Sequence, residues 1–142
     1  MNTVKLVAVF AENRPGQAAR VTEILARADI NIRCITVASS GTYGVMKLLV
    51  NDPASASEAL KREGFAATLM DVIAVEMPDK PGALHSIAAC LAAHEINLAN
   101  TSGFVANNRA ILVIEVHDPA PATVVLKEHG FHVLTQQEAL TV

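Results

Sequence analysis

The sequence contains two copies of one unit, and this internal repeat constrains the fold more than any other feature. Shifted against itself by 66 residues, the chain aligns without a gap, and 17 of the 76 aligned pairs are identical. The identities gather at turns and helix starts: Pro15-Gly16 falls on Pro81-Gly82, and Asp52-Pro53 falls on Asp118-Pro119. Such self-similarity is the signature of a duplicated structural unit. Whatever one half folds into, the other half is expected to repeat.

Each half shows the same order of strand and helix patterns. In the first half, apolar and β-branched runs predict strands over residues 4–11, 32–39, 43–50 and 65–70. Pro15-Gly16 opens one predicted helix, and Asp52-Pro53 begins another that ends at Gly64. In the second half, strands are predicted over residues 72–77, 97–105, 110–117 and 131–134, and helices over 82–93 and 119–129. Residues 135–142 form a short helical turn or extend the last strand.

This order, βαββαβ read twice, predicts an α+β protein of two ferredoxin-like units in tandem, with antiparallel sheets and both helices on one face. We expect the domains to cover residues 1–70 and 71–142. Because Met70-Asp71 alone joins the two predicted units, we expect them to pack as a pseudo-dimer.

The predicted strands are apolar on both faces. A sheet covered by helices on one side normally alternates apolar and polar residues. Residues 43–50 contain a single charged side chain, Lys47, and residues 110–116 also contain a single charged side chain, Glu115. The face away from the helices is therefore expected to pack on something, and a second chain is the simplest partner. We predict a homodimer.

A polar loop that ends in Pro-Gly lies between the first strand and the first helix of each half, at residues 12–17 and 78–83. The free N–H groups of a helix N-terminus and its dipole favour an anion such as a carboxylate. Asn13 or Asp79 is expected to cap the helix or to bind a ligand amine. Alternatively, Pro-Gly simply starts a helix. Each half also places an asparagine, Asn31 or Asn97, just before its second strand. If the copies join along these strands, the asparagine of one copy faces the loop of the other.

Together, the strand, the D-x-P-G-type loop, the helix and the Ile-Asn pair resemble ACT domains, which are small regulatory modules that bind amino acids, often at the interface between two copies. Residues 79–84 (DKPGAL) with Ile96-Asn97 match this pattern well, and residues 13–18 (NRPGQA) with Ile30-Asn31 match it with Asn in place of Asp. The resemblance covers essentially the whole chain, as a tandem pair without a catalytic domain.

The resemblance implies a regulatory sensor that binds a free amino acid between its two repeats, without catalysis and without a cofactor. The implied ligand contacts are Asn13, Arg14, Gly16 and Gln17 with Asn97, and Asp79, Lys80, Gly82, Ala83 and Leu84 with Asn31. We expect the second strand to line the pocket, so that Asn100 and Ser102 make one site more polar than the other. The alternative is an interaction subunit that binds no small ligand and modulates a separately encoded metabolic enzyme.

Composition excludes several other classes. A net charge of −3, with one Tyr, four Phe and no Trp, argues against nucleic-acid binding, which needs basic surfaces and aromatic platforms. No apolar run approaches the ~18 residues of a membrane-spanning helix. The first residues do not resemble a signal peptide, which predicts a cytoplasmic protein.

Metal binding and catalysis are not expected from the pattern of histidines and cysteines. Cys34 and Cys90 predict free thiols, with no cysteine or histidine nearby at metal-ligand spacing, and none of the five histidines follows a zinc spacing. His85, on the first turn after Gly82, is the one histidine that could touch a ligand. The serines have no nucleophile-elbow context, and the carboxylates are spread over different elements, so no catalytic residues are predicted.

Overall fold

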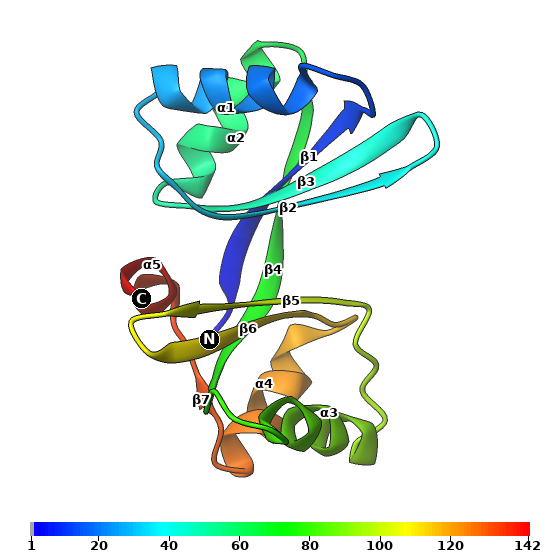
Figure 1. The fold of residues 1–142 in the computed structure, drawn as a ribbon, viewed down its shortest axis with the longest axis vertical. Coiled ribbons are helices and arrows are strands. Elements are labelled where there is room, and N and C mark those ends of the chain that lie inside the picture. Colours follow the sequence, from blue (N-terminus) through cyan, green and yellow to red (C-terminus); the bar gives the residue numbers. More distant parts are fainter. Residues whose placement is uncertain (1) are drawn as a thin grey trace. The chain divides into compact units, whose positions relative to one another are not determined.

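The computed structural model describes residues 2–142 (Figure 1). The chain divides into two compact units. The N-terminal unit comprises Lys5–Met70, and the C-terminal unit comprises Asp71–Val142 together with residues 2–4. Each unit contains a βαββαβ arrangement with an antiparallel sheet, so the predicted ferredoxin-like fold is confirmed.

The N-terminal unit contains four strands and two helices. In chain order they are β1 (Val4–Glu12), α1 (Gln17–Arg27), β2 (Ile32–Ser40), β3 (Tyr43–Val50), α2 (Pro53–Arg62) and the first part of β4 (Ala66–Met77). The sheet order is β2-β3-β1-β4, so β2 forms a sheet edge. Paired residues in the register Val9↔Met46 and Met46↔Val37 share one face of the sheet.

The two helices of the N-terminal unit cover one face of its sheet (Figure 1). Val21, Ile24 and Leu25 of α1 are buried, as are Ala56 and Leu60 of α2. They pack on alternate residues of the strands, which share one face of the sheet: Val7, Val9, Ala11, Met46, Leu48 and Val50. Every second residue of the strands and one side of each helix therefore point into a single apolar core.

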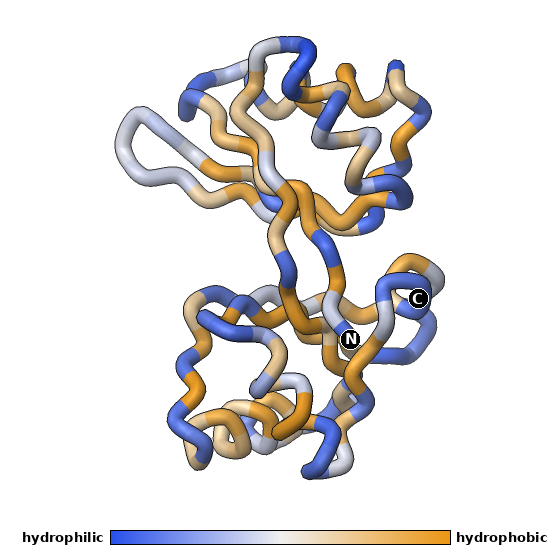
Figure 2. Tube along the Cα trace, turned by 180° about the vertical axis from the view of Figure 1, so that it is seen from behind, coloured by the Kyte–Doolittle hydropathy of each residue, from blue (hydrophilic) through white to orange (hydrophobic). Residues whose placement is uncertain are grey.

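The C-terminal unit repeats this plan and adds a helix. It contains the second part of β4, α3 (Ala83–Ala93), β5 (Asn100–Ala106), β6 (Arg109–Glu115), α4 (Pro119–Glu128), β7 (His132–Val133) and α5 (Gln136–Thr141). Its strands follow the order β7-β4-β6-β5, so β5 occupies the edge position that β2 has in the other unit. Ile73, Val75, Leu112 and Ile114 form the core with Ile87, Leu91 and Leu126 of the helices. Hydrophobic segments of the tube follow these strands and inner helix faces (Figure 2).

Several element boundaries differ from those predicted. The predicted strands on either side of Met70-Asp71 form one continuous strand, β4, and the strand predicted from residue 97 begins at Asn100. The last strand is shorter than predicted, His132–Val133, and it is followed by α5 (Gln136–Thr141). A capping box starts α5: the Thr135 hydroxyl accepts from the Glu138 N–H, and the Glu138 carboxylate accepts from the Thr135 N–H. Of the two alternatives for the tail, the structure has the helix.

Candidate functional site

The two Pro-Gly loops have the same backbone geometry. Gly16 and Gly82 are the N-cap residues of α1 and α3, with left-handed φ angles of 91° and 88°. The Gly16 carbonyl accepts from the Arg20 N–H at 2.9 Å, and the Gly82 carbonyl accepts from the Ser86 N–H at 3.0 Å. A Cβ atom built on either glycine would meet nothing within 4 Å. Glycine is therefore needed for the backbone angle, and the space over each helix start is open.

Neither polar loop residue caps its helix. In the described chain, α1 and α3 both start without a side-chain cap hydrogen bond, so the capping role considered for Asn13 and Asp79 is not seen. Asn13 instead ties the loop to the β2–β3 turn. Its Nδ2 donates to the Gly41 carbonyl at 3.1 Å, and its N–H donates to the Thr42 carbonyl at 2.7 Å. The N–H groups of the first helical turn thus have no side-chain acceptor from their own loop, which leaves them suited to an anion.

A small pocket of about 180 Å³ lies beside the loop of the N-terminal unit. Its floor is apolar, with Ala11 and Met46 from the sheet and Val37 from the edge strand β2. Its rim contains five polar residues: Glu12, Asn13, Arg14, Gln17 and Ser39. The volume of this pocket is smaller than the ~300–1,000 Å³ of sites for drug-sized ligands. It suits a small polar molecule, or it forms one half of a larger site. Of the predicted contacts, Asn13, Arg14 and Gln17 meet here, next to Gly16.

The charge on the rim is already paired. The Arg14 Nε lies 2.9 Å from Glu12 Oε2, with both side chains more than half exposed. Exposed pairs of this kind contribute little to stability, so the guanidinium can exchange its partner for a ligand carboxylate at small cost.

The corresponding surface of the C-terminal unit has different side chains. Leu84 and Val105 are 47% and 59% exposed, where the N-terminal unit has Ala18 and Ser39. Asp79, Lys80 and Gly82 are exposed, and Ala83 is buried at the start of α3. A larger hollow of about 560 Å³ adjoins this loop only at Pro78 and is lined mainly by Glu76, Arg109, Phe131 and His132. None of Asp79, Lys80, Gly82, Ala83 or Leu84 lines that hollow.

The expected role of Asn100 needs a correction. Asn100 pairs with Glu115 and Ser102 pairs with Val113, while Gly103 pairs with the core residue Leu112. Because directly paired residues share a face, Asn100 and Ser102 lie on the sheet face away from α3 and its loop. Thr101, Gly103 and Val105 occupy the face that the helices cover. Asn100 and Ser102 therefore do not face the loop of their own unit, and the expected contact of Asn100 with a ligand stays a prediction.

Asn31 and Asn97 lie at the other end of their sheets from the loops of their own units. Asn31 precedes β2, whereas the end of β2 pairs with Tyr43, next to Glu12 at the loop. The Asn31 N–H donates to Asn51 Oδ1 at 2.9 Å, and the Asn51 N–H donates to the Asn31 carbonyl at 3.2 Å. Asn97 has the corresponding position before β5. Within a unit, the structure does not bring either asparagine to the loop, and their pairing with the loop of the other repeat stays a prediction.

The structure brings together a second group of side chains that was not predicted from the sequence. Cys90, His94 and His129 offer one ligand atom each within 4.8 Å of one another. The expectation that neither cysteine has a histidine at metal-ligand spacing is wrong, because Cys90 and His94 are four residues apart on α3 and share a helix face. His129 follows α4 and is distant in the sequence. The four-residue spacing of Cys90 and His94 was the one feature of the sequence that could have predicted this group.

Both cysteine thiols have raised pKa values. Burial raises the pKa of the Cys34 thiol and that of the Cys90 thiol above the ordinary value. Catalytic cysteines have a lowered pKa in an electropositive surrounding.

No helix among residues 2–142 is long and apolar enough to cross a membrane.

Comparisons with known proteins agree with this geometry. The family model described as "ACT domain pair" matches residues 2–141. A crystal structure of a protein from Bacteroides thetaiotaomicron superposes with a TM-score of 0.90 at 32% identity, covering 95% of this chain and 94% of that one. The search of curated proteins finds no match.

Two more distant structures share the fold. The ligand-free regulatory subunit of aspartate kinase from Thermus thermophilus has a TM-score of 0.63 at 18% identity, covering 90% of this chain and 93% of that one. A structure of aspartokinase alpha and beta subunits has a TM-score of 0.58 at 22% identity, covering 89% and 91%. With the family model matched over residues 2–141, this chain belongs to the ACT domain pair family.

Proposed function

We propose that the protein is a regulatory sensor that binds a free amino acid at its Pro-Gly loops and catalyses no reaction. The observation that carries this proposal is the pocket beside α1, where an uncapped helix N-terminus, Arg14 and the polar residues Asn13 and Gln17 surround an apolar floor. The helix start and Arg14 suit a carboxylate, the amide oxygens suit an ammonium group, and the floor suits a side chain.

The exposed edge strand β2 supports a further wall for this pocket, formed by another ACT unit. Val37 of β2 is 57% exposed although it lies on the helix-covered face. An unpaired strand edge is a ready template for another strand. In this proposal, the second strand of another ACT unit, from the other repeat or from a second chain, closes the pocket and brings Asn97 or Asn31 to the loop.

The two sites would differ in selectivity. The pocket of the N-terminal unit has Gln17, Ala18 and Ser39, whereas the C-terminal unit has Ala83, Leu84 and Val105 at the same positions. A polar side chain is expected to bind better at the first site, and an apolar side chain at the second.

A regulatory interaction is the second candidate, and one surface favours it. On the sheet face away from α1 and α2, Phe10 and Tyr43 are 50% and 62% exposed beside Ala38 and Val45. Exposed apolar patches of this kind mark interaction sites. We propose that this patch joins two chains in a homodimer. A protein of the same fold, from Thermus thermophilus, is described as the regulatory subunit of aspartate kinase.

A thermal-shift screen against the twenty amino acids tests the proposed function. A ligand that binds only the native state raises the melting temperature by mass action, by an amount equivalent to ~2.7 kcal/mol at a hundred times its Kd. We expect one or a few amino acids to give a reproducible rise. If millimolar concentrations of all twenty leave the transition unchanged, the interaction subunit becomes the better account.

A further inference from the structure

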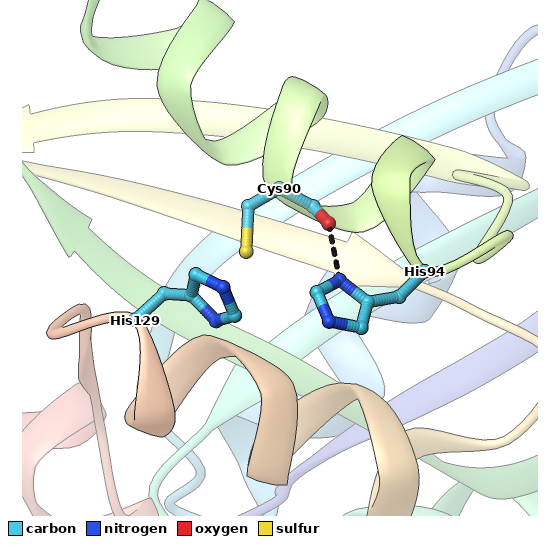
Figure 3. Close-up of side chains that lie close together, drawn as sticks. All are labelled: Cys90, His94 and His129. Carbon is cyan, nitrogen blue, oxygen red and sulfur yellow. Dashed lines mark hydrogen bonds between the residues drawn. The ribbon is translucent and has the colours of Figure 1, made fainter.

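The ends of α3 and α4 carry a group of side chains that amino-acid binding does not use. Cys90 lies on the last turns of α3, His94 is the C-cap of that helix, and His129 is the C-cap of α4. The thiol of Cys90 points from α3 toward the two imidazole rings (Figure 3). The ring centroids are 5.1 Å apart, with the rings nearly perpendicular. We infer that Cys90, His94 and His129 form a binding site for a zinc-like transition-metal ion.

The hydrogen bonds of both histidines prepare them as metal ligands. Nδ1 of His94 lies 2.9 Å from the Cys90 carbonyl, and Nδ1 of His129 lies 2.9 Å from the Val125 carbonyl. A carbonyl only accepts, so Nδ1 must carry the proton in each ring, and the lone pair is on Nε2. Metal-binding histidines typically have their second nitrogen held by a backbone carbonyl or a carboxylate in this way.

The local field also favours a cation. Helix C-termini carry partial negative charge, because their last carbonyl groups lack intrahelical partners. Two such termini, those of α3 and α4, meet at this cluster. One thiolate and two neutral imidazoles are a typical ligand set for Zn²⁺.

Binding requires a modest contraction of the cluster. The ligand atoms lie within 4.8 Å of one another. Zinc–sulfur and zinc–nitrogen bonds of about 2.3 and 2.0 Å in a tetrahedron place ligand atoms roughly 3.3–3.6 Å apart. Both imidazoles are exposed, so small side-chain rotations can close this difference. Three protein ligands leave a fourth position for water or an exogenous group.

The first repeat supplies an internal comparison. At the positions of Cys90, His94 and His129 it has Ile24, Ala28 and Glu63. Ile24 is buried in the core of its unit, and Glu63 pairs with Arg20 at 2.8 Å. The same fold therefore forms without the cluster, so packing of the fold does not require a cysteine and two histidines here.

Titration of the tag-free full chain with Co²⁺, followed by displacement with Zn²⁺, tests this site. Cobalt is a spectroscopic substitute for zinc. We expect one equivalent to give a thiolate-to-cobalt charge-transfer band and the intense visible bands of tetrahedral coordination, and Zn²⁺ to abolish both. Because a thiol loses its proton when it binds a metal ion, the affinity should increase with pH.

Two variants and one control separate a site from incidental binding. The variant Cys90→Ile/His94→Ala/His129→Glu takes the residues of the first repeat and should lose the charge-transfer band. His129→Gln, at an exposed position, should weaken Zn²⁺ binding by more than the ~100-fold that loss of a supporting group costs. Cys34→Ser should bind as the unmodified chain does, and circular dichroism establishes that each variant is folded. Absence of the thiolate band, or equal affinity in the chain and His129→Gln, would overturn the inference.

Discussion

At the scale of single residues, two glycines determine the shape of the candidate sites. Gly16 and Gly82 hold φ angles near +90°, which a residue with a Cβ atom adopts only with strain. The space beside them is open, so the cost of a substitution comes from the backbone and not from a clash. In the proposed function, the first N–H groups of each helix bind the ligand. A change at either glycine therefore acts on stability and binding together.

Replacement of Gly16 by alanine separates these two effects. We expect Gly16→Ala to destabilise its unit by about 1–2 kcal/mol. Each kcal/mol should lower the Tm by ~4–8 °C. Amino-acid binding at that loop should weaken by about ten- to a hundredfold, the loss of a hydrogen bond to a charged group. Scanning calorimetry and isothermal titration measure the two quantities.

Gly64→Ala is the matched control. Gly64 has a φ angle of +89°, also with open space beside it, but it follows α2 and does not line the pocket beside α1. It should cost a similar amount of stability and leave the affinity unchanged. If both variants weaken binding equally, the loop has no special role.

At the scale of elements, helix starts divide into two kinds. The Asp52 and Asp118 side chains cap α2 and α4, whereas α1 and α3 begin at glycine. Asp52 accepts from the Ser55 N–H at 3.1 Å and from the Ser55 hydroxyl at 2.7 Å. The repeat therefore caps its second helix internally and leaves the first open. This division supports the first helix as the ligand-binding one.

The Asp52 cap predicts a dependence of stability on pH. The hydrogen bonds from the Ser55 side chain and backbone lower the pKa of the Asp52 carboxyl below its ordinary value of 3.8. A carboxyl with a lowered folded pKa stabilises the fold above its unfolded pKa and loses that contribution as the pH falls through the folded pKa. Asp52→Ala should lower the Tm at pH 7, and the difference from the unmodified chain should shrink below pH 4.

Ser55→Ala provides the comparison for that titration. It removes the hydroxyl donor and keeps the backbone donor, so it should move the Asp52 pKa part of the way back toward its ordinary value. NMR titration of the Asp52 carboxyl carbon measures this pKa directly. An Asp52 pKa at or above the ordinary value in the unmodified chain would contradict the cap.

Prediction from the sequence succeeded for elements that the repeat duplicates and failed where the repeat is broken. The helices after Pro15-Gly16 and Pro81-Gly82 and the strand order follow from patterns present twice. The helix α5 has no counterpart in the first repeat, because the chain there continues as β4. The face of Asn100 depends on register, which a one-residue difference in strand start reverses. The cluster of Cys90, His94 and His129 required knowledge of which helix ends meet.

At the scale of the whole molecule, the chain is one pair of ACT domains whose Pro-Gly loops are surrounded by different side chains. We also predict the association of two chains through the patch of Phe10, Ala38, Tyr43 and Val45. Replacing Phe10 and Tyr43 by lysine should convert a dimer to a monomer, because two desolvated charges oppose the contact. Both side chains are at least half exposed, so the fold should survive.

Sedimentation equilibrium measures that change. Val124→Lys is the control, because Val124 of α4 is 54% exposed and lies outside the patch. It should leave the mass unchanged. A monomeric unmodified chain, or a dimer that survives Phe10→Lys/Tyr43→Lys, would remove this patch as the dimer interface.

Binding of a free amino acid at the Pro-Gly loops is the central claim, and isothermal titration tests it most directly. The unmodified chain, Gly16→Ala and Gly82→Ala are titrated with each amino acid that shifts the Tm. The account predicts saturable binding to the unmodified chain and the loss of one class of sites in the corresponding glycine variant. Absence of binding at millimolar amino acid, or binding that neither glycine variant alters, would contradict it.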